Sequence, residues 1–252
     1  MCLPEPLKIK KTKMQNLENK VAIITGGSKG IGYGVAAALM EQGMKVAITS
    51  RSQENADSAA ASLRKAGKGE VVGLAADVRS LESQKNVVKK VLEKWGKLDL
   101  MVANAGIGIF GSIEELTEEQ WRDTIDTNLT GVFFSVKASL EALKESKGYI
   151  ITISSLAGTN FFAGGSAYNA SKFGLTGFSQ AVMLDVRSHG VKVTTIMPGS
   201  VATYFNNHEP NDKDGWKIQI EDIGEMVVDL MKMNPRTLPS KIEVRPTIPP
   251  KG

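Results

Sequence analysis

The chain has 252 residues, of which 42% are hydrophobic and 23% are charged. It is therefore long enough to bury a substantial core, and its composition is that of an ordinary globular protein. The formal net charge is +4, but residues 1–13 carry four lysines and one glutamate, which leaves only +1 for the rest of the chain. A body so close to neutral argues against a nucleic-acid partner.

Residues 1–15 are predicted to form a basic flexible tail, because prolines lie among the lysines and no apolar signal region is present. No run approaches the roughly 18 consecutive apolar residues of a membrane span, so no membrane partner is expected. Cys2 is the only cysteine, and His189 and His208 lack ligand spacing, so no disulfide and no metal site are expected. These features predict a cytoplasmic protein.

Short apolar runs rich in β-branched residues alternate along the chain with longer segments of helical period. The predicted strands are residues 21–24, 45–49, 71–74, 98–102, 149–153 and 191–196, with a seventh near 242–244. The predicted helices lie near 30–42, 53–66, 79–95, 117–145, 166–188 and 221–233. This alternation predicts an α/β fold of Rossmann type, a doubly wound parallel sheet with helices on both faces, in one domain from residue 16 to 252.

The first predicted strand runs directly into Thr25-Gly26-Gly27-Ser28-Lys29-Gly30-Ile31-Gly32 and then into a helix. Glycines at such a turn let the backbone approach a pyrophosphate, and the free N–H groups and dipole of the helix favour an anion there. The spacing differs from the usual G-x-G-x-x-G, and the turn lacks the Gly-Lys-Ser/Thr ending of a P-loop. We therefore expect a dinucleotide site and not a nucleotide triphosphatase.

A second pattern lies in the predicted helix 166–188. Tyr168 and Lys172 are four residues apart, which places them on one helix face, and Ser155 lies thirteen residues upstream. A positive charge beside a phenol favours the phenolate. By spacing alone, such a pair is more often a tyrosine packed on the helix with a lysine beside it. A catalytic role is therefore favoured only together with the motifs elsewhere in the chain.

Together these elements resemble the short-chain dehydrogenase/reductase family, from about residue 16 to residue 244. The glycine turn resembles the cofactor turn of that family, and Asp77-Val78 resembles its adenine-contacting pair. Residues 103–106 resemble its Asn-Asn-Ala-Gly element, with Ala103 in place of the first asparagine. The pattern is completed by Asn128, Ser155, Tyr168 with Lys172, and Pro198-Gly199 with Thr203.

The resemblance implies hydride transfer between a nicotinamide and a carbonyl carbon. Tyr168 would give a proton to the developing alkoxide, and Ser155 would hold the substrate oxygen. Lys172 would lower the tyrosine pKa and bind the nicotinamide ribose, while Asn128 would hold a water that links Lys172 to solvent. Two alternatives stay open: Ser154 and Ser155 would merely cap a turn, and Asn128 would bond its own helix backbone.

The end of the second predicted strand bears on the choice of cofactor. A carboxylate there favours NAD, whereas an arginine accommodates the 2′-phosphate of NADP; this chain has Ser50 and Arg51, and Lys29 would add a second cation. We predict NADP(H), the alternative being that both cations are merely solvated. The expected cofactor-binding set is Gly26, Ser28, Lys29, Gly30, Ile31, Gly32, Ser50, Arg51, Asp77, Val78, Asn104, Ala105, Gly106, Tyr168, Lys172, Pro198, Gly199, Val201 and Thr203.

The substrate pocket is predicted to contain Ser155 and Tyr168 together with Phe161 and Tyr204, and residues 204–220 are expected to form a small polar lid. The first expectation is an NADPH-dependent reductase of a small-molecule ketone or aldehyde. A reductase of 3-oxoacyl-acyl-carrier-protein thioesters is the alternative, although His189 stands where that group would have an arginine. Another alternative is a non-catalytic NADP(H)-binding sensor or scaffold. The resemblance also implies a homodimer or homotetramer assembled through the helices 117–145 and 166–188.

Overall fold

The structure, a computed structural model, describes residues 14–249. Most of the predicted N-terminal tail, residues 1–13 with Cys2, therefore lies outside the described residues. Seven strands form one parallel sheet in the order β3-β2-β1-β4-β5-β6-β7, which confirms the predicted fold class. The strands are β1 (Val21–Ile24), β2 (Lys45–Ser50), β3 (Val71–Ala75), β4 (Leu100–Ala103), β5 (Tyr149–Ile153), β6 (Lys192–Pro198) and β7 (Lys241–Val244).

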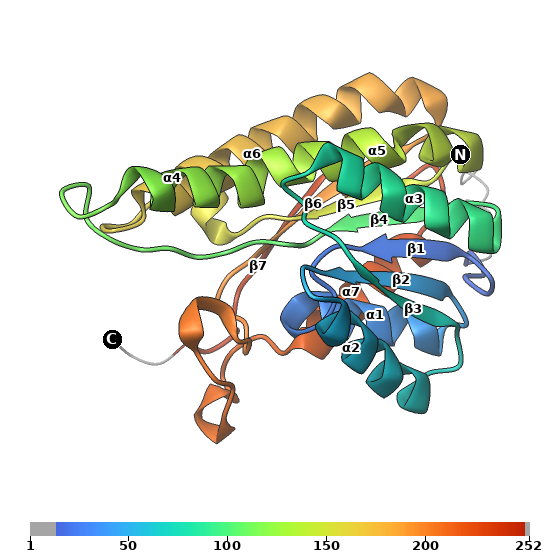
Figure 1. The fold of residues 1–252 in the computed structure, drawn as a ribbon, viewed down its shortest axis with the longest axis horizontal. Coiled ribbons are helices and arrows are strands. Elements are labelled where there is room, and N and C mark those ends of the chain that lie inside the picture. The colour runs from blue at the N-terminus through green and yellow to red at the C-terminus, as the bar shows by residue number, and fades with distance from the viewer. Residues whose placement is uncertain (1–13, 250–252) are drawn as a thin grey trace, which may run out of the picture.

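Helices cover both faces of the sheet (Figure 1). One face carries α1 (Gly30–Glu41), α2 (Gln53–Ala66) and α7 (Ile220–Lys232), and the other carries α3 (Leu81–Trp95), α5 (Gly131–Ser146) and α6 (Ser166–Val186). Successive side chains of a strand point to opposite faces, so Ile24 packs in the first core and Ile23 in the second. Runs of adjacent apolar residues in the strands thus supply both cores.

The segment predicted as helical at 117–145 is helical throughout, but it contains a wide turn. It consists of α4 (Glu118–Ile125), a π-helical turn over Asp126–Thr130, and α5. Asn128 lies in the wide turn, where its side chain bonds the backbone of Ile107 in the loop after β4. Such wide turns are common at functional sites, and this one connects the helix to the edge of the sheet where the strands end.

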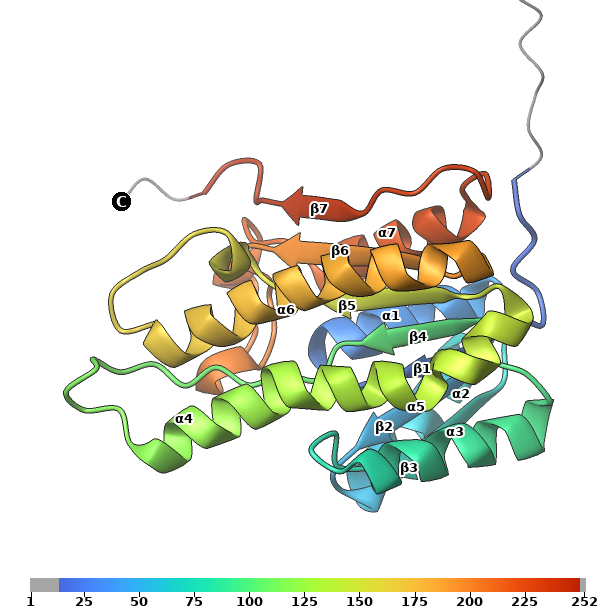
Figure 2. The same cartoon turned by 90° about the horizontal axis from the view of Figure 1, so that it is seen from above.

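The carboxyl ends of the strands point the same way, toward α4 and the N-terminal end of α6 (Figure 2). The chain order of the strands reverses between β1 and β4, and ligands of open α/β sheets bind in the crevice outside such a reversal. The predicted lid segment, residues 204–220, crosses this end of the molecule with short turns at Phe205–Asn207 and Asp212–Asp214. Function is therefore to be sought at this edge.

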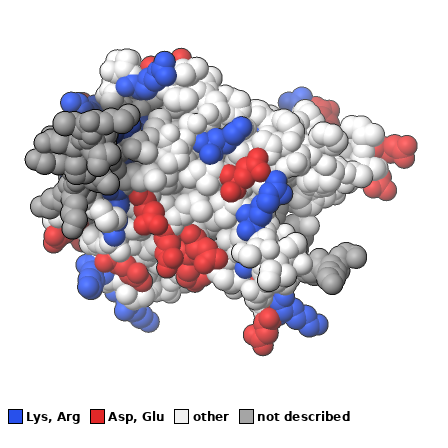
Figure 3. Space-filling view, turned by 180° about the vertical axis from the view of Figure 1, so that it is seen from behind, with Lys and Arg blue, Asp and Glu red and all other residues white. Residues whose placement is uncertain are grey.

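The surface of the described residues bears on the expected partners. On the face seen from behind, acidic side chains gather in one patch, whereas the basic side chains lie in separate small groups and form no basic stripe on this face (Figure 3). No helix within residues 14–249 is long and apolar enough to span a bilayer.

Candidate active site

A single cleft of about 1730 Å³ runs along the carboxyl edge of the sheet. This volume exceeds that of most small-ligand pockets, so the cleft has room for a dinucleotide and a substrate together. All but three of the predicted site residues line it. The exceptions are Gly32, Asn128 and Phe161, each of which the structure places elsewhere.

The glycine turn is held by the loop after β4. The side-chain amide of Asn104 donates hydrogen bonds to the carbonyl oxygens of Thr25 (2.9 Å) and Gly26 (3.1 Å). In return, the Thr25 hydroxyl accepts bonds from the backbone N–H groups of Asn104 and Ala105. These bonds between Thr25, Gly26 and Asn104 form a clamp between the glycine turn and the loop after β4. A Cβ on Gly32 would lie 2.5 Å from the Asn104 amide nitrogen, so this glycine makes room for the clamp and not for a ligand.

The first turn of α1 is open toward the cleft. Helix α1 begins at Gly30, which has φ +58°, and the preceding residue, Lys29, makes no side-chain cap. No acidic residue lies in the first turn, so its N–H groups and positive dipole end remain available to an anion. These are the features that a dinucleotide pyrophosphate requires, and the turn therefore fits that group.

The end of β2 offers a cation and hydroxyl groups where an NAD-selective site would offer a carboxylate. Ser50 and Arg51 line the cleft, and the buried hydroxyl of Thr49 beside them has no hydrogen-bond partner among the described residues. Arg51 lies near enough to help lower the pKa of Asp77, although the main cause of that shift is the hydrogen-bonded guanidinium of Arg79. This part of the cleft fits a phosphorylated ribose.

Two predicted cofactor residues make contacts that the sequence did not indicate. Asp77 is held by Arg79, whose guanidinium donates bonds of 2.8 to 3.2 Å to both carboxylate oxygens. The ammonium of Lys29 lies 5.7 Å from the ring centroid of Tyr204 in the lid segment. Lys29 is thus directed toward the lid, whereas Arg51 lies beside Asp77. Arg79 also lines the cleft, and only its sequence position beside Asp77 could have suggested it.

The two serines after β5 face different surroundings. The buried hydroxyl of Ser154 contacts the Thr176 hydroxyl (3.1 Å) and the Lys172 carbonyl (3.3 Å) on α6. Ser155 lines the cleft, and its side chain lies near enough to the Tyr168 phenol to lower its pKa. It also accepts a bond from the N–H of Ala157, so it caps the following turn as well. The geometry therefore favours Ser155 as the residue that meets a substrate.

Burial shapes the chemistry of Tyr168 and Lys172. Burial raises the pKa of Tyr168, and the side chain of Ser155 only partly opposes this shift; the lowering of this pKa by Lys172 stays a prediction. Lys172 is itself buried, which lowers its pKa to about 8, and its ammonium donates a 3.0 Å hydrogen bond to the Ile153 carbonyl. At neutral pH the site thus holds a neutral phenol, the form that can give a proton.

Asn128 is fully buried behind the cleft. Its side-chain oxygen accepts from the N–H of Ile107 (2.8 Å), and its amide donates to the Ile107 carbonyl (2.9 Å) and the Ser171 hydroxyl (3.1 Å). The alternative that it bonds its own helix is therefore not what the structure shows. Asn128 positions the loop after β4 against α6, and its predicted role in holding a water stays a prediction.

The aromatic residues that line the cleft differ in part from the predicted ones. Phe161 is 86% exposed and lies outside the cleft, whereas its neighbour Phe162 lines it. Tyr204 lines the cleft as predicted, and Phe110 and Phe205 line it too. The rings of Phe110 and Phe205 lie 5.3 Å and 5.7 Å from the Tyr168 ring. The sequence indicated aromatic residues in these loops, but it did not indicate which of them face the cleft.

Comparison with known proteins agrees with this geometry. Residues 20–214 match the family model described as short chain dehydrogenase. The chain is 39% identical over 189 residues to a 3-oxoacyl-acyl-carrier-protein reductase of Vibrio cholerae, a match that covers 75% of this chain and 76% of the relative.

Solved structures are similar over almost their whole length. An alcohol dehydrogenase from the archaeon Thermococcus sibiricus, complexed with 5-hydroxy-NADP, has a TM-score of 0.87 at 32% identity and covers 93% of this chain and 100% of its own. A variant of actinorhodin polyketide ketoreductase with NADPH has a TM-score of 0.81 at 29% identity, covering 92% of this chain and 98% of its own.

Proposed function

Since the chain belongs to the short chain dehydrogenase family, we propose that it is an NADPH-dependent oxidoreductase that reduces a ketone or aldehyde to the alcohol, reversibly. The observation that carries the proposal is the convergence of Ser155, Tyr168 and Lys172 on one cleft beside an open helix N-terminus. The same three side chains also argue against a non-catalytic sensor, which would not need a proton donor at this place.

The arrangement suits proton delivery to a carbonyl oxygen. When bound, the nicotinamide supplies the hydride for the carbonyl carbon. The Ser155 hydroxyl orients the oxygen by a hydrogen bond, and the neutral phenol of Tyr168, 8% exposed, gives it a proton as negative charge develops. Lys172, behind the phenol, supplies positive charge that stabilises the phenolate left after the transfer.

The preference for NADP(H) over NAD(H) is supported by the end of β2. Arg51 and Ser50 line the cleft where a ribose 2′-phosphate would lie, and neither residue is acidic. Two structural relatives are complexed with phosphorylated dinucleotides. The residues that would hold the pyrophosphate are those of the glycine turn and the first turn of α1, and Lys172 would reach the nicotinamide ribose.

Reduction of a 3-oxoacyl-acyl-carrier-protein thioester is the second candidate, favoured by the similarity to the Vibrio cholerae enzyme. An acidic carrier protein needs basic residues near the entrance. Near the C-terminal end of α6 the chain has Arg187 and His189, and Arg245 lines the cleft itself. Since His189 replaces an expected arginine, the small-molecule carbonyl remains the first choice.

A panel of simple ketones, aldehydes, secondary alcohols and 3-oxoacyl thioesters, assayed by NADPH absorbance, tests the proposal. Turnover of free ketones at kcat/KM above that of the thioesters supports the carbonyl reductase, and the opposite order supports the acyl-carrier reaction. No turnover on any of them, with tight binding of NADPH, would overturn both and leave a sensor.

We further propose that the protein is a homodimer or homotetramer assembled through α5 and α6. The supporting observation is that large apolar side chains on these helices remain partly exposed in the single chain, namely Phe133, Phe173 and Leu184. Sedimentation that finds only the single-chain mass would remove this proposal. The cytoplasmic location and the division of the chain at residue 15 stay predictions.

A further inference from the structure

The loops around the cleft bring two phenylalanine rings, Phe110 and Phe205, to the catalytic phenol and a third, Phe162, against Phe110. Phe110 follows β4, Phe162 follows β5 and Phe205 follows β6, so the rings come from segments far apart in the sequence. Phe110 contacts the rings of Phe162 (5.7 Å between centroids), Tyr168 (5.3 Å) and Phe205 (6.3 Å). We define Phe110, Phe162 and Phe205 as the aromatic wall.

The geometry of the wall suits a planar aromatic ring. The rings meet at interplanar angles of 59° to 71° around Phe110, so they present edges and faces together. Such tilted contacts are the arrangement that aromatic pairs prefer, and each adds about 0.5–1.5 kcal/mol beyond the burial of area. Phe110 and Phe205 are 39% and 38% exposed, which leaves ring surface for another partner.

The inward position of Phe205 depends on Gly108. A Cβ at residue 108 would lie 2.4 Å from two atoms of the Phe205 ring, so a larger residue there would push the ring away from Tyr168. The ring centroid of Phe205 lies 5.7 Å from that of Tyr168. A substrate that reaches the phenol must therefore pack against Phe205 or displace it.

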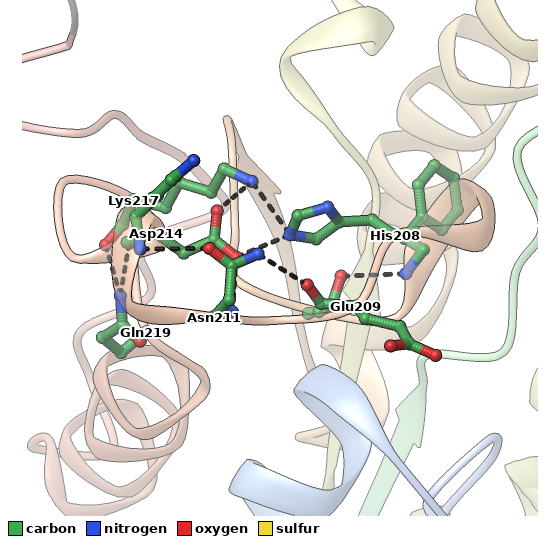
Figure 4. A network of polar contacts seen from close by, with 9 residues as sticks. His208, Glu209, Asn211, Asp214, Lys217 and Gln219 are labelled. Atoms are coloured by element: carbon green, nitrogen blue, oxygen red, sulfur yellow. Dashed lines mark hydrogen bonds and ion pairs between the residues drawn. The ribbon is translucent and has the colours of Figure 1, made fainter.

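The segment that carries Phe205 is fixed at its other end by a buried carboxylate (Figure 4). Asp214 pairs with the ring of His208 and, at 2.6 Å, with the ammonium of Lys217, and it accepts a bond from the N–H of Asn211. Gln219 donates bonds to the carbonyl oxygens of Asp214 and Lys217. This network holds the lid segment across the cleft, with Phe205 near the phenol.

We propose that the aromatic wall makes the enzyme selective for ketones that bear an aromatic ring next to the carbonyl group, and that Phe205 is the main specificity residue. The inference rests on the proposed function, because it names the substrate class of the same site. With the aryl ring against the wall, the carbonyl oxygen lies within the reach of Ser155 and Tyr168. A straight acyl chain would gain no edge-to-face contact there.

The test compares acetophenone with methyl cyclohexyl ketone, which has a ring of the same size but no π system. In the unchanged protein, kcat/KM for acetophenone is expected to be the higher. In Phe205→Leu the ratio of the two values should fall by about threefold to tenfold, the equivalent of one aromatic contact. Phe110→Leu should act in the same direction, and Gly108→Ala should reproduce the effect without removing a ring.

Phe161→Leu is the matched control, because this adjacent phenylalanine lies outside the cleft; it should leave the ratio unchanged. Circular dichroism and NADPH titration by fluorescence establish that each variant folds and binds cofactor. Saturation-transfer NMR of acetophenone with the protein alone provides a readout without turnover, and the signal should weaken in Phe205→Leu.

The outcomes separate the two claims. If neither these ketones nor any other compound of the panel is reduced, the proposed function fails, while the NMR signal still tests the wall. If both are reduced and Phe205→Leu leaves the ratio and the NMR signal as they were, the function stands and the aromatic selectivity is overturned. A kcat/KM for a 3-oxoacyl thioester above that for acetophenone would overturn it too.

Discussion

The ammonium of Lys172 lies 5.6 Å from the centroid of the Tyr168 ring, one helical turn further along α6. Both side chains are buried, and burial opposes charge on each: it raises the pKa of the phenol and lowers that of the amine. Tyr168 is therefore a neutral acid, and the ammonium of Lys172 beside it loses its proton more easily than an exposed lysine does. This relationship sets the expected effects of pH and of substitution at both positions.

Replacing the phenol tests the proton donor directly. Tyr168→Phe keeps the ring and its contacts with Phe110 and Phe205 but removes the proton, so kcat for ketone reduction should fall by about 10²- to 10⁴-fold. NADPH affinity, measured by fluorescence titration, should stay nearly unchanged. Retention of more than a tenth of kcat would mean that another group, or water, delivers the proton.

The pH dependence distinguishes Lys172 from Tyr168. The pKa of Lys172 is lowered to about 8, so the ammonium is present below that pH and lost above it, whereas the raised pKa of Tyr168 keeps the phenol protonated throughout this range. We expect kcat/KM for NADPH, which reports on groups of the free protein, to fall as pH rises through about 8. A profile that stays flat to pH 10 would show that the charge of Lys172 is not needed.

Much of this site could be predicted from the sequence, because the resemblance to the short-chain dehydrogenase/reductase family assigned Ser155, Tyr168 and Lys172 to one site, which helix spacing by itself did not establish. The orientation of Phe161 and Phe162 could not. Asn169 on α6 donates bonds to the backbone carbonyls of Ala157 and Asn160, and this fixes the path of the loop and turns Phe162 inward. The lowered pKa of Lys172 also could not be predicted from the sequence, because it depends on burial and not on spacing.

The π-helical turn at Asn128 is another feature that the sequence did not predict. The hydrophobic period of residues 117–145 favours one continuous helix, and the extra residue in the turn is compensated by bonds from Asn128 to Ile107. Such a long-range exchange, between residues 21 positions apart, leaves no local mark in the sequence. Tertiary contacts therefore decide the position of this wide turn.

Two glycine substitutions test the clamp between the glycine turn and the loop after β4. Gly32→Ala should lower the free energy of unfolding by about 1–3 kcal/mol, because the new methyl would overlap the Asn104 amide and the Gly26 carbonyl. Gly177→Ala in α6 is the control: no atom lies within 4 Å of its Cβ position. That change should be neutral or stabilising by about 0.5–1 kcal/mol. Urea denaturation of both variants gives the comparison, and equal effects would count against the clamp.

Arg51 should decide between the two dinucleotides. Arg51→Ala removes a cation beside the expected 2′-phosphate but nothing that touches the rest of NADH, so kcat/KM with NADPH should fall by about tenfold or more while that with NADH changes little. Arg64→Ala, which changes an arginine of α2 outside the cleft, serves as the control. An unchanged ratio of NADPH to NADH in Arg51→Ala would contradict the assignment.

Asp214 should hold the lid segment in place. Its pKa is lowered from 3.8 to about 2, first by the hydrogen bond from Lys217 and then by that from His208. A lowered pKa in the folded protein means that the carboxylate stabilises the lid fully above pH 4, and that this contribution is lost as pH falls from about 4 toward 2. Asp214→Asn should therefore speed hydrogen exchange of the lid amides at pH 7.

The matched control is Asp212→Asn, which changes an exposed carboxylate in the same short turn and should leave exchange as it was. Because Phe205 belongs to the lid segment, Asp214→Asn should also raise the KM for ketones more than the KM for NADPH. Exchange rates that match those of the unchanged protein would show that the network of Figure 4 does not fix the lid, and the position of Phe205 would then rest on its contacts with Tyr168 and Phe110 alone.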